Sequence, residues 1–232
     1  MSYNIETIKN RCKRLAGIRY FKTVDSTNQE ARRIASQEAC DGLLVLTDMQ
    51  SAGRGRLGRN WNNDGDNAIA MSLILRPPIK PENVSMLTII AALAVSEGIE
   101  KACGLKTDIK WPNDIKYNGR KLCGILSESV FSGQSYYSVI GIGINVNTES
   151  FPDEIKDIAA SVSQFTGKKE NREDIIAESI SSFFRYYDIL CRDQNLSALA
   201  DEYNEKCITE GGINKLGELI MPDGSLKRSG EV

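Results

Sequence analysis

The chain has 232 residues, of which 41% are hydrophobic and 26% are charged, and its formal net charge is −2. This length suits one main domain with a small appendage, and the slight acidic excess argues against general nucleic-acid binding. The sequence contains no histidine, which excludes histidine-based triads and H-E-x-x-H metal sites. Any catalysis must therefore rest on Lys, Arg, carboxylates and amides.

The sequence lacks the usual signals for export or membrane insertion. Its first residues contain no apolar signal core, and its longest apolar stretch, 87–95, is too short to cross a bilayer. We therefore expect a soluble, cytoplasmic protein. The six cysteines are scattered without a C-x-x-C pair, which favours reduced thiols packed as small apolar groups over disulfides or a zinc site.

The order of the predicted helices and strands indicates the fold class. Helices are predicted from apolar residues at helical spacing and from capping residues such as Thr27 with Glu30; strands are predicted from short or alternating apolar runs. In chain order the sequence predicts a helix over 27–38, strands over 43–47 and 67–76, a buried helix over 85–103, strands over 107–111, 121–130 and 136–145, a long helix from Asn171 and a short helix over 196–207. Gly133-Gln134 is the predicted turn of the last hairpin. Hairpins rather than regular βαβ units predict an α+β fold.

A glycine-rich basic loop is predicted between the first two strands, within 50–66. It contains the run Gly53-Arg54-Gly55-Arg56-Leu57-Gly58-Arg59. Glycines let backbone amides approach a ligand, and arginines donate forked hydrogen bonds to phosphate or carboxylate groups. The spacing is not that of a P-loop. Taken alone, the loop fits small-anion binding and an ordinary basic surface loop equally well.

Three further motifs could face the same ligand. Lys110-Trp111-Pro112-Asn113-Asp114 follows a predicted strand, and its last residue could hold Mg²⁺ through one carboxylate, although an ordinary turn is the favoured alternative. Lys121 enters an apolar strand shortly before Gly124, and could pair with a substrate carboxylate or extend to water. Gly141-Ile142-Gly143-Ile144-Asn145 clears one face of a strand, either for a flat ligand or for a tight packing contact.

These four motifs, preceded by Asp25-Ser26-Thr27-Asn28 and Gln50, resemble the biotin protein ligases in order and spacing. The resemblance runs from about residue 18 to residue 207 and includes Ala160-Ser161 and Thr166-Gly167. It implies a mixed, largely antiparallel sheet backed by helices, as in biotin and lipoate ligases. It also implies an enzyme that activates biotin with ATP to biotinyl-5′-AMP and transfers the biotin to a lysine of a biotin carboxyl carrier protein or domain. No DNA or membrane partner is expected, and the protein is expected to be a monomer or a homodimer.

The resemblance implies roles for individual residues. The residues expected to contact biotin are Ser26, Thr27, Asn28, Gln50, Gly53, Arg54, Gly55, Arg56, Lys121, Gly124 and Gly143, with Gly141 in the floor beside them. The residues expected to face ATP are Arg56, Arg59, Trp61, Lys110, Asn113 and Asn145, and Asp114 is expected to hold Mg²⁺. Arg54, Arg56 and Lys121 are the expected catalytic cations, because a carboxylate and a triphosphate repel each other unless positive charges screen them.

The resemblance is weaker at the two ends of the chain. Only about seventeen residues precede it, so the helix-turn-helix of many bacterial members is not expected, and residues 1–207 are predicted to form a catalytic domain alone. Residues 208–232 resemble the last hairpin of the family's small β-barrel, and a shortened β remnant is expected there. The alternatives are a biotin or biotinyl-adenylate binding protein without efficient transfer, a DNA-binding repressor, and a lipoate ligase, whose family motif includes a histidine.

Overall fold

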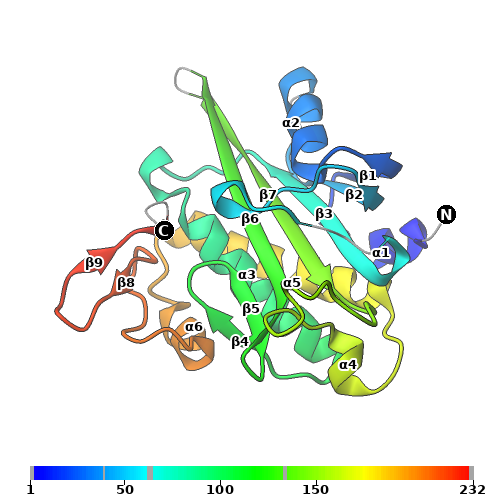
Figure 1. Cartoon of the computed structure of the whole chain (residues 1–232). Helices are drawn as coiled ribbons and strands as arrows, with labels where there is room; N and C mark the ends of the chain where they lie inside the picture. Colours follow the sequence, from blue (N-terminus) through cyan, green and yellow to red (C-terminus); the bar gives the residue numbers. More distant parts are fainter. Residues whose placement is uncertain (1–2, 39, 62–64, 133–134, 230–232) are drawn as a thin grey trace.

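The computed structural model describes residues 3–38, 40–61, 65–132 and 135–229. Its main feature is a seven-stranded sheet of order β1-β2-β3-β7-β6-β5-β4 (Figure 1). The strands are β1 Gly17–Val24, β2 Leu43–Gln50, β3 Ala68–Leu75, β4 Asp108–Lys110, β5 Asp114–Tyr117, β6 Arg120–Ser132 and β7 Ser135–Asn145. Only β1 and β2 run parallel, and the other neighbours are antiparallel. The predicted mixed, largely antiparallel sheet is confirmed.

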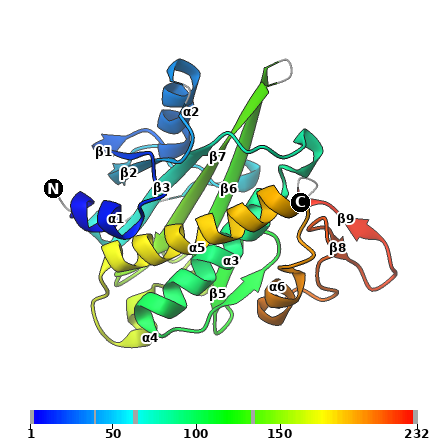
Figure 2. The same cartoon turned by 180° about the vertical axis from the view of Figure 1, so that it is seen from behind.

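Helices cover the two faces of the sheet unequally. They are α1 Ile5–Arg11, α2 Thr27–Gln37, α3 Met86–Cys103, α4 Val162–Thr166, α5 Arg172–Asp193 and α6 Ala200–Lys206, with short 3-10 turns at Arg56–Gly58, Gly65–Asn67 and Pro81–Asn83. Figure 2 shows α3 and α5 side by side across one face of the sheet. On the opposite face α2 covers one end and leaves the middle to the loop after β2 (Figure 1). None of the helices in the described residues is both long and apolar enough to span a bilayer.

The hydrophobic core has two parts because the sheet is covered on both sides. The larger part lies between the sheet, α3 and α5, and includes Met71, Ile90 and Phe183. The smaller part lies under α2, where Ala31 and Ala35 pack on Leu43, Val45, Ile74 and Val139. The helix α3 is apolar on nearly all sides because it lies between the sheet and α5.

The ends of several elements follow the predicted capping residues. Gly104 ends α3 in the left-handed conformation, with φ of 72°, and the Asn171 side chain accepts from Asp174 N at 3.1 Å to begin α5. The capping box expected from Thr27 and Glu30 does not form. Ser26 is the N-cap residue, and Glu30 pairs with a neighbouring arginine instead.

The structure also corrects one predicted helix and contains elements that the sequence did not predict. The helix predicted over 196–207 is shorter, because the Leu196 amide bonds to Lys215 O at 2.7 Å and its turn precedes α6. The helices α1 and α4 and the strands β1 and β5 were not predicted. The predicted turn Gly133-Gln134 lies outside the described residues.

The segment after Cys207 packs onto the main domain. It contains the two-stranded sheet β8 Leu219–Ile220 and β9 Leu226–Lys227. Leu219 is buried in the larger core, and Trp111 Nε1 donates to Gly217 O at 3.2 Å. The segment therefore lies against the turn between β4 and β5, beside the glycine-rich loop (Figure 1).

Candidate active site

A cavity of about 310 Å³ lies beside the start of α2. Its walls come from the start of α2, the loop after β2, the turn between β4 and β5, and the facing positions of β6 and β7. The cavity-lining residues that the sequence motifs predicted are Ser26, Thr27, Asn28, Gln50, Arg54, Gly55, Arg56, Arg59, Trp61, Lys110, Asn113, Asp114, Lys121, Gly124, Gly141 and Gly143. Motifs that are far apart in sequence thus meet at one place.

Three glycines form the floor of this cavity. In the register of β6 and β7, Gly124 pairs with Gly143 and Leu126 pairs with Gly141, so these positions share one face. A Cβ at residue 141 would lie 2.2 Å from Asn28 Oδ1, and one at residue 143 would lie 2.3 Å from Trp61 Cε2. Glycine is therefore needed because other side chains come close to the strands here. The predicted open face is covered in this structure by the Trp61 indole.

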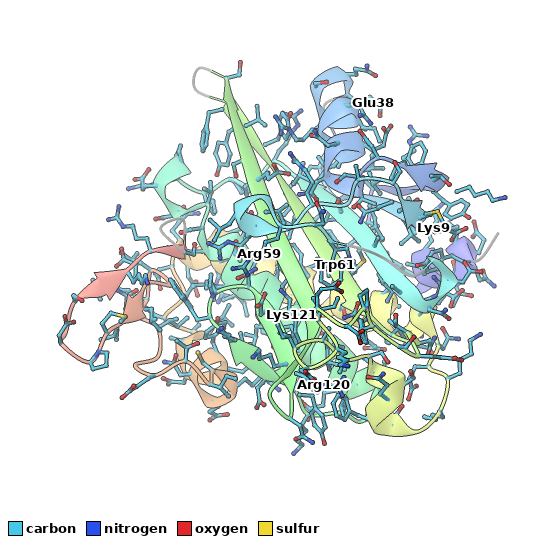
Figure 3. The ribbon with its side chains drawn as sticks, viewed as in Figure 1. Lys9, Glu38, Arg59, Trp61, Arg120 and Lys121 are labelled. Atoms are coloured by element: carbon cyan, nitrogen blue, oxygen red, sulfur yellow. The ribbon has the colours of Figure 1, made fainter. Side chains whose placement is uncertain are left out.

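Lys121 places its ammonium over this floor. It lies near the start of β6, and its Nζ is 2.6 Å from Asp114 Oδ1, the first residue of the neighbouring strand β5. The same nitrogen is 5.9 Å from the centroid of the Trp61 ring, within the range of a cation–π contact. Figure 3 shows Trp61 and Lys121 together in front of the sheet. Lys121 and Asp114 are both half-buried, so their charges are only partly screened by water.

Arg56 of the glycine-rich loop approaches the cavity from the other side. It donates to Asn113 Oδ1 at 3.1 Å and to Ser229 O at 2.6 Å, so it connects the loop to the β4–β5 turn and to the C-terminal segment. Burial lowers the pKa of the Arg56 guanidinium, and the charge of Asp114 partly offsets that effect. The guanidinium nevertheless stays charged at neutral pH, because arginine is not deprotonated in proteins.

The start of α2 supplies neutral polar groups. Thr27 donates to Gln50 Oε1 from its backbone nitrogen at 2.8 Å and from its hydroxyl at 3.2 Å. Ser72 Oγ donates to Asn28 Oδ1 at 2.6 Å, and Asn28 Nδ2 donates to Glu128 Oε2 at 2.8 Å. The protein thus engages both atoms of the Asn28 amide. Asn28 therefore has a structural role at this end of the cavity, because it connects α2 to β3 and β6, in addition to its expected contact with a ligand.

Two of the predicted site residues do not line the cavity. Gly53 is buried against the backbone of the loop, where a Cβ would lie 2.2 Å from Trp61 O. Gly53 therefore allows the two parts of the loop to pack closely and does not face the ligand. Asn145 pairs with Ala68 at the end of β7 and is only 6% exposed. Its expected contact with the nucleotide stays a prediction.

Sequence reasoning also missed residues that build the cavity. Glu128 contacts two lining residues, and Leu126 lies in the lining itself. Ser72, on β3, holds Asn28 in place. The available signal was alternation, because Gly124, Leu126 and Glu128 occupy every second position of β6 and therefore share a face.

Taken together, these features define the class of protein. A cavity with a glycine floor, cations from two separate stretches and neutral amides at the start of a helix is suited to a small ligand that carries a carboxylate or phosphate. The sequence profile of the biotin/lipoate A/B protein ligase family matches residues 20–145. The chain belongs to this family.

Two curated relatives are similar to this chain over more than half of its length. The bifunctional ligase/repressor BirA of Bacillus spizizenii is 48% identical over 171 residues, which cover 72% of this chain and 53% of the relative. The biotin–[acetyl-CoA-carboxylase] ligase of Paracoccus denitrificans is 42% identical over 131 residues, 56% of this chain and 53% of the relative. The chain spans about half the length of the curated relatives it matches.

One solved structure has a similar fold over nearly the whole chain. The biotin protein ligase from Aquifex aeolicus, determined in complex with biotin and ATP, superposes with a TM-score of 0.79 at 26% sequence identity. The match covers 94% of this chain and 97% of that chain. The resemblance to biotin protein ligases that the motifs indicated is confirmed.

Proposed function

We propose that this chain activates biotin with ATP to biotinyl-5′-AMP and transfers the biotin to a lysine of a biotin carboxyl carrier domain. The observation that carries the proposal is the meeting of Lys121 and Arg56 at one glycine-floored cavity. Cations suit a carboxylate and a triphosphate, and the neutral amides and hydroxyls at the start of α2 suit a ureido ring. The relatives named as biotin ligases, and the Aquifex aeolicus structure with biotin and ATP, support the same assignment.

In the first half-reaction, a biotin carboxylate oxygen attacks the α-phosphorus of ATP and pyrophosphate leaves. Both reactants are anions, and two like charges about 4 Å apart repel by about 4 kcal/mol at an effective dielectric constant near 20. Lys121 and Arg56 would reduce this repulsion and hold the carboxylate in line with the phosphorus. Because Lys121 Nζ lies 2.6 Å from Asp114 Oδ1, the incoming anion competes with Asp114 for the ammonium.

In the second half-reaction, the uncharged amine of the acceptor lysine attacks the carbonyl carbon of the mixed anhydride. The bond from that carbon to the phosphate oxygen breaks, AMP leaves with the electron pair, and the new amide nitrogen gives up one proton to solvent. Arg56 and Lys121 would stabilise the departing phosphate through the same contacts that held it during activation.

Magnesium fits this cavity as a partner of the nucleotide phosphates. Asp114 is the one carboxylate among the lining residues that the structure describes, and Mg²⁺ commonly takes one or two protein carboxylates and completes its shell with phosphates and water. Asp114 would supply that carboxylate, and the ion would ease the charge of the triphosphate. The contact of Asp114 with Lys121 uses Oδ1.

The test incubates the purified chain with biotin and Mg-ATP and measures pyrophosphate release. A biotin carboxyl carrier domain is then added, and its mass is measured for the gain of one biotinyl group. We expect Lys121→Ala to lower pyrophosphate release on the order of 100-fold. Lys116→Ala is the matched control, because Lys116 bonds to Gly119 O at 3.0 Å and lies outside the cavity lining.

Three outcomes would contradict the proposal. Pyrophosphate release that does not depend on biotin, or that survives Lys121→Ala at the rate of the control, would remove the role of the cavity in activation. Adenylate that forms and stays bound without modifying the carrier domain would instead favour a biotinyl-adenylate binding protein.

A further inference from the structure

Glu128 contacts two residues of the cavity wall without lining the cavity itself. Its Oε2 accepts from Asn28 Nδ2 at 2.8 Å, and its Oε1 accepts from Arg54 NH2 at 2.8 Å. Asn28 belongs to the start of α2, and Arg54 belongs to the glycine-rich loop. One carboxylate on β6 therefore joins two elements that would otherwise contact the sheet separately.

Glu128 lies far from the ammonium that the proposed activation step uses. The Lys121 ammonium lies 3.1 Å from where a Cβ on Gly124 would be, and Glu128 is four residues further along the strand, about 13 Å at about 3.3 Å per residue. In the register of β6 and β7, Glu128 pairs with Val139, beyond the glycine pairs of the floor. The Glu128 contacts therefore act on the end of the cavity opposite to Lys121.

The chemistry of these contacts requires a carboxylate. The Asn28 amide and the Arg54 guanidinium present two donors, and an ionised carboxylate offers an acceptor oxygen to each. A glutamine has almost the same shape but only one acceptor oxygen, and its NH2 group would face a donor. The Glu128 side chain is 24% exposed, against 41% for Arg54, so water compensates only partly for a lost contact.

We infer that Glu128 is a positioning residue for the ring-binding end of the cavity. Through Asn28 it fixes the start of α2 over the floor, and through Arg54 it holds the glycine-rich loop in place. This inference rests on the proposed function and deepens it. The orientation of Asn28 and of the loop matters equally before and during activation. Loss of the Glu128 carboxylate therefore weakens binding of biotin in the ground state and the transition state alike. It raises KM more than it lowers kcat.

The test compares Glu128→Gln, Glu128→Asp and the control Glu38→Gln. Glu38 lies 3.6 Å from Arg19, and Figure 3 shows it at the outer end of α2, away from Trp61 and Lys121. In pyrophosphate release, Glu128→Gln is expected to raise the KM for biotin about 10-fold with kcat within about 3-fold of the parent. Glu128→Asp keeps both acceptors and the charge, so it is expected to raise KM less than the isosteric glutamine does. A purely steric role would reverse that order.

A second measurement needs no substrate. Trypsin cleaves after the loop arginines Arg54, Arg56 and Arg59, and release of the loop from Glu128 should speed this cleavage about 5- to 10-fold in Glu128→Gln but not in Glu38→Gln, because cleavage tracks the population of the open form. Equal cleavage rates in all variants would overturn the inference, as would a fall in kcat with unchanged KM. If the parent protein releases no pyrophosphate, the proposed function fails, and the cleavage rates still decide whether Glu128 holds the loop.

Discussion

Gly143→Ala would force the Trp61 indole off the cavity floor. The added Cβ would lie 2.3 Å from Cε2 and 2.5 Å from Nε1 of Trp61, whereas carbon atoms in contact prefer about 3.5 to 4.0 Å. Residue 143 sits in β7 and pairs with β3 on one side and β6 on the other. Because the strand is held on both sides and the indole belongs to a surface loop, the indole is the part that moves.

The size of the effect follows from the burial of the ring. A tryptophan buries about 150–250 Å², and Trp61 is half-buried, so losing about 100 Å² at about 25 cal/mol per Å² would destabilise the fold by about 2.5 kcal/mol. One term opposes this loss. Trp61 Nε1 is buried with no hydrogen-bond partner among the described residues, and exposing it would recover about 1 kcal/mol. The net expectation is a loss of about 1–2 kcal/mol.

Urea denaturation of Gly143→Ala, Trp61→Ala and the double variant measures this coupling. Gly17→Ala on the edge strand β1 is the control, because its Cβ would meet only Leu43 Cδ1, at 3.2 Å. We expect the alanine at residue 143 to cost little once the indole is absent, so the two substitutions should be non-additive by more than about 1 kcal/mol. Additive losses would refute the reasoning, since they would mean that the strand and not the indole had moved.

Three further changes have expected outcomes. Gly98→Ala should lower the free energy of unfolding by about 2–3 kcal/mol in urea denaturation, because its Cβ would lie 2.2 Å from Ser179 Oγ and 2.6 Å from Ser179 Cα; a loss below that of Gly17→Ala would contradict the close packing of α3 on α5. Burial raises the pKa of the Cys123 thiol, so iodoacetamide near about pH 8 should leave Cys123 unmodified in the folded protein, as read by peptide mass spectrometry. Pairing with Arg33 lowers the pKa of Asp25 in the folded state, so this contact stabilises the fold above the unfolded-state pKa of about 3.9 and is lost as pH falls through the lower folded value. The stability difference between Asp25→Asn and the parent should therefore shrink in acid, and a constant difference would contradict the pairing.

The elements that the sequence predicted well are those whose pattern reflects burial on both sides. The helix α3 is apolar over most of its length, which identified it, and the strand β3, buried at every position, was identified by its alternating apolar residues. The edge strand β1 was missed because none of its residues is fully buried; its pairing with β2 specifies it. The strand β5, with four residues, is too short for periodicity to detect.

The site was predicted to the extent that its residues fall into motifs. Glycines and arginines at fixed spacing identified the glycine-rich loop. Glycines within the strands identified the floor, because each strand needs glycine where another side chain comes close to it. Glu128 was missed because a single glutamate in a strand usually faces water, and only the pairing of β6 with β7 brings it toward Asn28 and Arg54. The contact between Arg56 and Ser229 O depends on how the C-terminal segment packs, which no local pattern encodes.

Three cations of the cavity are held by acceptors from the protein itself: Arg54 by Glu128, Arg56 by Asn113 and Ser229, and Lys121 by Asp114. A substrate anion that binds Lys121 therefore exchanges one ion pair for another, and the net gain from charge is smaller than the Coulomb energy of the new pair. An anion should therefore gain little from its contact with Lys121 alone. The neutral end of the cavity differs, because Thr27 and Gln50 are already oriented by hydrogen bonds to each other. A ligand meets these groups without displacing a charge.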